Sequence, residues 1–193
     1  MKTISSLIFL MLFLLSNKSI AQVTTVTSGV FLTAKDYQNN KLVQEADCQK
    51  EQEKFKTNPI FSKSTFDVIY KGKKVTYQKK DLYAYRDCGN KIWRFYDNKE
   101  YEILEAKGIY IYSINKVVYD EGIIEKEPRY YFSIDASGEI IELTVDNLKL
   151  AYPKNKIFHN MIDEKFKVDD AIHSYDFSHK MFTVNYLFSQ SKK

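Results

Sequence analysis

The chain has 193 residues, a formal net charge of +4, and an unusual load of aromatic side chains, 15 Tyr and 13 Phe. Lys2 and Lys18 stand in a leading segment without acidic residues, so the rest of the chain carries too little positive charge to indicate a nucleic-acid-binding protein. Six Gly and three Pro exclude a collagen-like or disordered chain, and the aromatic content favours β structure.

The first 21 residues have the pattern of a secretory signal peptide. Lys2 is followed by an uninterrupted apolar run from Leu7 to Leu15, and Ser19-Ile20-Ala21 places small residues before Gln22. The run is shorter than the roughly 20 apolar residues of a spanning helix, and no later stretch is apolar enough for a second span. We expect export to the periplasm or the exterior with cleavage after Ala21, and an uncleaved anchor is the alternative.

Two cysteines follow the leader, Cys48 and Cys88. In an exported chain two cysteines predict one disulfide bond, and two free thiols are the alternative. The closed loop of about 40 residues corresponds to roughly 4 kcal/mol of stability in a chain-entropy estimate. A metal site needs more such ligands, and the chain has no CxxC pair.

The segment after the leader begins with a polar stretch, residues 22–28, that we expect to hang loose. Residues 29–32 are apolar and suggest an edge strand. Thr33 can cap a short helix, with Asp36 in its first turn. Residues 44–56 are charged and poor in apolar side chains, which suggests a solvated helix or loop.

Strand patterns dominate the middle of the chain. Residues 66–70 and 75–78 are predicted strands joined across Lys71-Gly72-Lys73. The stretch from Leu82 to Ile114 holds three more, separated by turns at Gly89-Asn90, Asn98-Lys99 and Gly108, which is typical of an antiparallel meander. Within it Trp93 and Phe95 share one face of a strand, and the opposite face carries Ile92, Arg94 and Tyr96.

A second hairpin is predicted further on. Residues 129–134 and 139–143 flank Asp135-Ala136-Ser137-Gly138, which suits a type I turn followed by a left-handed glycine. The charged residues 121–127, which end at Pro128, suit a loop or a hairpin.

The pattern changes to helical at Thr144. Thr144 can cap a helix over 145–152 that Pro153 ends, and Asn155 can cap a second one. Asp169 can cap a short turn through Ile172. The second helix has an apolar stripe at helical spacing, made of Ile157, Phe158, Met161, Ile162 and Phe166. Residues 177–188 fit a helix or a strand, and their length favours a helix.

These patterns predict an α+β fold, an antiparallel meander with hairpins of about six to eight strands, covered by C-terminal helices. After the signal peptide (1–21) and the lead (22–28), we expect a single domain over 29–190. Its β-rich part ends at 143, and its helical part begins at 144.

Four segments carry a resemblance to a known group of proteins. They are GVFLTAKDYQNNKL, CGNKIWRFYDNKEYEILEAKGIYIYS, YYFSIDASGEIIELTVDNLKLAYP and HKMFTVNYLF. In order and character they are similar to an uncharacterised family of secreted proteins from Gram-negative bacteria, over about residues 29–189. The family has no assigned activity or catalytic residues. The resemblance therefore implies export and one domain, and it implies nothing about chemistry.

Common catalytic motifs are absent from the sequence, which has no GxSxG, HExxH, P-loop or GxGxxG. His159 and Asp163 stand four apart on a predicted helix, where a surface charge pair is the simpler interpretation. His173 and His179 are residue types that bind transition metals, but with His159 their spacing matches no recognised site. We therefore predict no catalytic residues, metal or cofactor.

Glu102 and Glu105 are the other acidic pair considered. Three residues apart on a strand, they point to opposite faces, which argues against an acid–base pair.

Tyr96, Tyr101, Tyr110 and Tyr112 are the binding residues that the sequence suggests. They can form an aromatic platform for carbohydrate or peptide, because Tyr joins a flat apolar ring to a polar tip. The alternative is a core packed under the C-terminal helices. We predict a non-catalytic envelope module that binds an envelope protein or polysaccharide and no nucleic acid. A hydrolase of an envelope polymer with dispersed acidic or His residues is the alternative.

Overall fold

The structure is a computed structural model. Its main element is one eight-stranded antiparallel sheet in the order β11-β10-β9-β8-β7-β6-β1-β2. Residues 27–49, 55–56, 63–120, 123–167 and 171–192 are described. From β6 to β11 neighbouring strands are consecutive in the chain, so the predicted α+β meander is confirmed. The strands are β1 (Thr27–Phe31), β2 (Val43–Asp47), β6 (Ala84–Arg86), β7 (Ile92–Tyr96), β8 (Lys99–Glu105), β9 (Tyr110–Asp120), β10 (Ile123–Ser133) and β11 (Ile141–Glu142).

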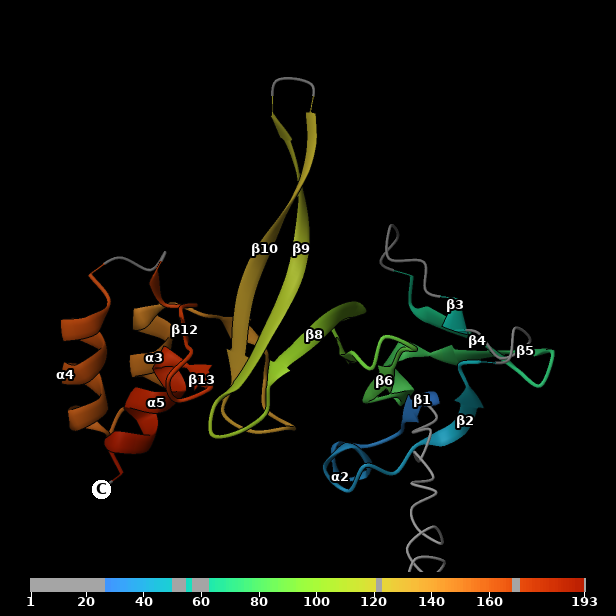
Figure 1. The fold of residues 1–193 in the computed structure, drawn as a ribbon, viewed down its shortest axis with the longest axis horizontal. Helices are drawn as coiled ribbons and strands as arrows, with labels where there is room; N and C mark the ends of the chain where they lie inside the picture. The colour runs from blue at the N-terminus through green and yellow to red at the C-terminus, as the bar shows by residue number, and fades with distance from the viewer. Residues whose placement is uncertain (1–26, 50–54, 57–62, 121–122, 168–170, 193) are drawn as a thin grey trace, which may run out of the picture.

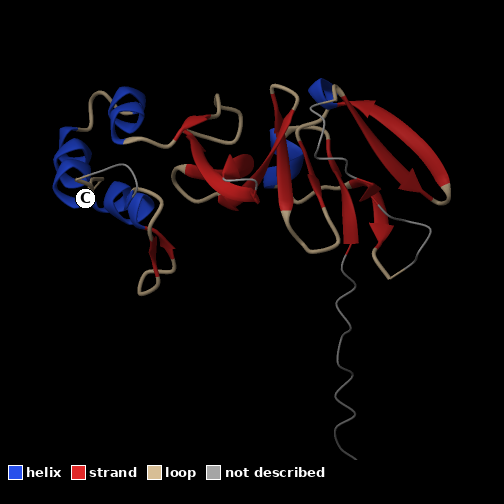
Figure 2. Cartoon of the chain, turned by 90° about the horizontal axis from the view of Figure 1, so that it is seen from above, coloured by secondary structure: helices blue, strands red, loops and turns tan. Residues whose placement is uncertain are grey.

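Smaller elements lie at the two ends of this sheet (Figure 1). Seen from above, α3, α4 and α5 gather at one end and the sheet β3-β4-β5 lies at the other (Figure 2). The two smaller sheets consist of β3 (Phe55–Lys56), β4 (Thr65–Tyr70) and β5 (Lys73–Gln78), and of β12 (Tyr175–Asp176) and β13 (Met181–Phe182). The helices are α2 (Ala34–Gln38), α3 (Val145–Ala151), α4 (Lys156–Lys165), α5 (Thr183–Gln190) and the short 3₁₀ helix η2 (Lys79–Asp81).

Three helices begin where the sequence predicts. Thr33 accepts a hydrogen bond from the backbone N–H of Asp36, whose carboxylate in turn accepts from the N–H of Thr33, which forms a capping box. Thr144 caps α3 and Asn155 caps α4, each with its side-chain oxygen. These caps are local interactions, and local sequence is enough to predict them.

The N-terminal strands differ from expectation. β1 begins at Thr27 and lies between β6 and β2, so residues 29–31 are not an edge strand and the strand starts inside the expected lead. Residues 43–47 form the edge strand β2, so the interpretation of 44–56 as helix or loop is wrong there. An edge strand has one solvated side, which accommodates the polar side chains that suggested a loop. Residues 50–54 lie outside the described part.

The second hairpin also differs in detail. β10 continues through Pro128, which pairs with Asn115 of β9. Proline fits there because β11 pairs only with Tyr131 and Phe132, so the other side of Pro128 has no neighbouring strand. Gly138 does not have a positive φ. The turn is closed instead by Asp135, whose Oδ1 accepts from the N–H groups of Ser137 and Gly138.

One face of the main sheet is covered in two halves. Near the helices, Ile109, Ile111 and Phe132 pack with side chains of α3, α4 and α5. Near the other end, Tyr85 and Phe95 pack with residues of β4, among others. Strand alternation places both groups on the same face, so one sheet organises two separate cores.

The opposite face buries a third cluster, rich in tyrosine. Phe31, Tyr83, Tyr101, Tyr110 and Tyr112 form its centre. It is covered by residues of α2 and of the β10–β11 loop, and not by the C-terminal helices. The covering layer that the sequence suggested for these tyrosines is therefore wrong.

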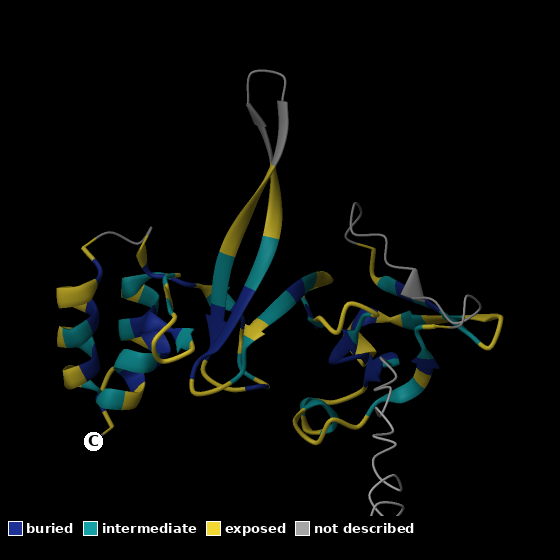
Figure 3. Cartoon of the chain, viewed as in Figure 1, coloured by how far each residue is buried: buried dark blue, intermediate teal, exposed yellow. Residues whose placement is uncertain are grey.

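Helix α4 turns its apolar stripe inward and its charged side chains to solvent (Figure 3). Phe158 and Ile162 are fully buried, Phe166 is buried and Met161 is half-buried, as predicted. Ile157 is 58% exposed, so it does not belong to the stripe. In residues 177–188 the helix begins only at Thr183, because a hairpin occupies the preceding residues. Asp169 lies outside the described part.

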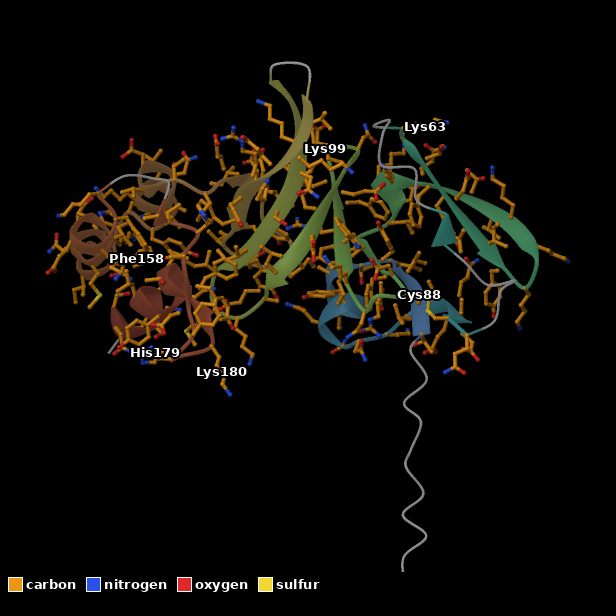
Figure 4. The ribbon with its side chains drawn as sticks, turned by 45° about the horizontal axis from the view of Figure 1, so that its top comes forward. Lys63, Cys88, Lys99, Phe158, His179 and Lys180 are labelled. Atoms are coloured by element: carbon orange, nitrogen blue, oxygen red, sulfur yellow. A yellow bond between two sulfur atoms is a disulfide. The ribbon has the colours of Figure 1, made fainter. Side chains whose placement is uncertain are left out.

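The predicted disulfide bond between Cys48 and Cys88 is present, with a Cα–Cα distance of 5.5 Å (Figure 4). It ties the segment after β2 to the turn between β6 and β7. The two cysteines are 40 residues apart in the chain, and their bond joins the ends of two strands, β2 and β6, that lie on either side of β1.

Removing the Phe158 side chain should destabilise the protein strongly. Phe158→Ala empties a fully buried site between α4 and α5, and we expect a loss of about 3–5 kcal/mol in the free energy of unfolding. Ile157→Ala, at the exposed neighbouring position, should cost less than about 0.5 kcal/mol. Urea unfolding measures both. Equal midpoints for the two variants would contradict this packing.

Candidate functional site

A pocket of about 350 Å³ lies between η2 and the turn from β7 to β8. Its volume is at the lower end of the range of small-molecule sites. The pocket is lined by Lys79, Lys80, Leu82, Phe95, Tyr96, Asp97 and Asn98.

A buried ion pair holds one side of the pocket in place. Lys79 is only 4% exposed, and its Nζ lies 2.9 Å from Glu100 Oε1 and donates to the carbonyl oxygen of Asn98 at 3.0 Å. The hydroxyl of Tyr85 donates to Glu100 Oε2 at 2.9 Å. Both oxygens of the carboxylate are thus satisfied, which a buried pair needs to offset its desolvation.

The rim is a two-residue hairpin turn. Asp97 (φ 48°) and Asn98 (φ 60°) are both left-handed and join the paired residues Tyr96 and Lys99. Positive φ at both central residues is the type I′ turn, which Asp and Asn tolerate better than most residues. The predicted Asn98-Lys99 turn is therefore displaced by one residue. The turn exposes a carboxylate and an amide at the mouth of the pocket.

The walls combine apolar and polar residues in similar measure. Leu82 and Phe95 are buried, and Tyr96 is half-buried with its ring centroid 5.7 Å from the guanidinium carbon of Arg94. The formal charges around the pocket cancel, because Lys79 is paired with Glu100 and the exposed Lys80 is balanced by Asp97. This arrangement suits an uncharged polar ligand with one apolar face.

Only Tyr96 of the four candidate tyrosines reaches this pocket. Tyr101, Tyr110 and Tyr112 are 4%, 9% and 0% exposed and belong to the tyrosine-rich core. The structure thus places three of the four in the core, the alternative considered for them, and leaves Tyr96 at its edge.

The histidine candidates are separated from one another. His159 Nε2 lies 2.9 Å from the carbonyl oxygen of Tyr152, whereas Asp163 forms an ion pair with Lys149. His159 and Asp163 are therefore not the surface pair that their spacing suggested.

The other two histidines make aromatic contacts. His173 stacks on Tyr130 with ring centroids 4.4 Å apart. His179 stacks on Tyr186 at 3.9 Å, and its Nδ1 lies 2.8 Å from Asp176 Oδ2.

The two glutamates have separate structural roles. Glu102 pairs with Lys91 at 2.8 Å. A bulge follows Ile103, and beyond it Glu105 accepts from the backbone N–H of Phe182 at 2.7 Å and from the amide of Asn185 at 2.9 Å. Glu105 therefore supplies the cap that α5 lacks from its own residues.

Among the described residues, no group of three or more His, Cys, Asp or Glu side chains lies where it could hold a metal ion. None of the helices described is long and apolar enough to cross a membrane.

Searches of protein-family models, curated proteins and solved structures found no significant match to this chain. The family resemblance suggested by the sequence therefore stays a prediction.

Sequence reasoning missed most of the pocket. Asp97-Asn98 between alternating apolar residues is itself a hairpin signal, and it indicates the rim once the register is right. Lys79 has no such signal, because its partner Glu100 is 21 positions away and only the folded sheet brings the two together.

Because some of the tyrosines are buried, the free energy of unfolding should fall as the pH becomes alkaline. It raises the pKa of Tyr37 and of Tyr101 to about 12, from the usual value near 10. The neutral phenols favour the folded state, so their contribution is fully present below pH 10 and is lost as the pH rises through about 12.

Tyr101→Phe should therefore reduce the loss of stability between pH 10 and pH 12. Tyr175→Phe, at a more exposed position, serves as the control and should keep the profile of the unmodified protein. Urea unfolding at a series of pH values measures this dependence. If the free energy of unfolding of Tyr101→Phe falls with pH as steeply as that of the unmodified protein, the Tyr101 phenol does not contribute to this pH dependence.

Proposed function

We propose that the protein is an exported, non-catalytic module that binds an uncharged stretch of envelope polysaccharide in the pocket between η2 and the β7–β8 turn. The observation that carries this proposal is the composition of the pocket. Two aromatic residues, Phe95 and Tyr96, line it from the end of β7, next to a rim of short polar groups, Asp97 and Asn98.

A sugar ring matches this combination chemically. Its C–H face packs on an aromatic ring, and its hydroxyl groups donate to carboxylate and amide oxygens or accept from amide and ammonium N–H groups. The cancelled formal charges at Lys79, Lys80, Asp97 and Glu100 favour a neutral sugar over a polyanion.

The pocket is also preorganised. The rim is fixed by the type I′ turn, and the inner side is fixed by the Lys79–Glu100 pair and its bond to Tyr85. A site that is ordered before the ligand arrives loses less conformational entropy on binding.

Export is supported by two independent features. The first 21 residues have the three-part pattern of a signal peptide. The Cys48–Cys88 bond fits an oxidising compartment, such as the periplasm or the exterior.

The exported protein should begin at Gln22 and contain no free thiol. Intact-mass measurement before and after alkylation under non-reducing, denaturing conditions checks both points. A membrane-bound species that retains residues 1–21, or alkylation of Cys48 and Cys88, would contradict this prediction.

The glycan proposal is tested with variants that keep the turn. Asn98→Gly and Asp97→Asn preserve a left-handed turn but remove an amide or a charge, so each should weaken glycan binding about tenfold. Titration calorimetry of the mature protein with solubilised envelope polysaccharide measures the affinity. Release of reducing ends in the same samples would instead indicate the hydrolase.

Asn90→Gly provides the matched control. Asn90 is also left-handed (φ 61°) and exposed in a turn, but it does not line the pocket. Its variant should bind like the unmodified protein. The proposal fails if no envelope glycan binds, or if Asn98→Gly and Asn90→Gly bind equally well.

A further inference from the structure

The hairpin β12–β13 projects from the helical end of the molecule (Figure 2). Phe177 at its turn is 85% exposed, and Tyr175 on β12 is 43% exposed. Their rings are in edge contact, with centroids 5.2 Å apart. A strongly exposed phenylalanine next to a second, partly exposed aromatic ring forms an apolar tip.

The turn that presents Phe177 is held by its own hydrogen bonds. Asp176 Oδ1 accepts from the N–H groups of Ser178 and His179 at 2.9 and 3.0 Å, and Asp176 Oδ2 lies 2.8 Å from His179 Nδ1. The ring of His179 stacks on Tyr186 of α5. The exposure of Phe177 is therefore a feature of an ordered turn.

The base of the hairpin is fixed to the core. The backbone N–H of Thr183 donates to the carbonyl oxygen of Ser174 at 2.9 Å, and their hydroxyl groups are 3.0 Å apart. Tyr175 packs edge-on against Phe182, which is buried. The tip projects from a rigid support.

A lysine stands in the same turn. Lys180 is exposed and points away from the body of the molecule (Figure 4). The carboxylate of the turn, Asp176, is engaged with His179. The cation of the turn that is directed to solvent is therefore Lys180.

We propose that this hairpin docks the protein on an anionic lipid bilayer. Phe177 enters the boundary between headgroups and acyl chains, Tyr175 lies at headgroup level, and Lys180 contacts lipid phosphates. A single convex aromatic tip suits a fluid bilayer, which closes around it, and aromatic residues with nearby lysines are typical of membrane interfaces. One inserted ring gives reversible docking, which does not depend on the glycan pocket.

Vesicle flotation tests this proposal with the mature protein. The vesicles contain equal amounts of phosphatidylcholine and phosphatidylglycerol, or phosphatidylcholine alone. We expect binding to the anionic vesicles, weaker binding to the neutral ones, and a loss with added salt because charge contributes. Phe177→Ser should reduce binding roughly tenfold or more, and Lys180→Glu should reduce it for anionic vesicles only.

Leu150→Ser is the matched control, because Leu150 is also strongly exposed but lies on a different element, α3. It should bind vesicles like the unmodified protein, and all variants should keep their melting temperature. The proposal is overturned if anionic vesicles do not float the protein, or if Phe177→Ser and Leu150→Ser behave alike. Capture of an envelope protein by Phe177 without vesicle binding would also overturn it. Glycan binding should be unchanged in Phe177→Ser, which separates the two proposals.

Discussion

The buried guanidinium of Arg94 connects three neighbouring parts of this sheet. It donates to the hydroxyl of Tyr112 at 2.8 Å, to Ser133 Oγ at 3.4 Å and to the carbonyl oxygen of Gly138 at 2.7 Å. These acceptors are neutral, and they belong to β9, to β10 and to the loop after it. Because no carboxylate is among them, part of the compensation for burying the charge comes from ring faces, of which Tyr83 is 5.2 Å from the guanidinium carbon.

This constraint decides which face of the sheet stays closed. The tyrosines around Arg94 serve as its hydrogen-bond partners and as rings that face its charge, so they are part of the core and not an open platform. Tyr96 lies at the end of β7, where that core stops, and the next two residues turn the chain. Phe95 points to the opposite face and meets the Lys79 side chain. The pocket therefore forms where one strand contributes to both faces of the sheet and then ends.

The sequence predicted local features well and non-local ones poorly. Alternation along β7 predicted that Phe95 and Arg94 lie on opposite faces of the sheet. This is confirmed, because Phe95 packs in the cluster with Tyr85, whereas Arg94 lies against the ring of Tyr96. Alternation does not say which layer covers a face. The core alternative for the tyrosines therefore named the C-terminal helices, whereas α2 and the β10–β11 loop cover them. The edge strand β2 was not predicted, because it carries polar and charged side chains. An edge strand accommodates such side chains, since one of its sides is solvated. The Lys79–Glu100 pair of the pocket was not predictable, since only the completed meander brings its members together.

The joint between the sheet and the helical end depends on Glu105. Its two carboxylate oxygens hold the N–H of Phe182 and the amide of Asn185, and that amide group also bonds to both the N–H and the C=O of Ile109. Bonds to backbone groups fix orientation as well as distance, so α5 and the hairpin before it have one position relative to β8 and β9. The same strand β8 begins at the pocket rim and ends at Glu105. The pocket and the hairpin that carries Phe177 are therefore connected through one strand, β8, and each keeps a fixed position relative to it.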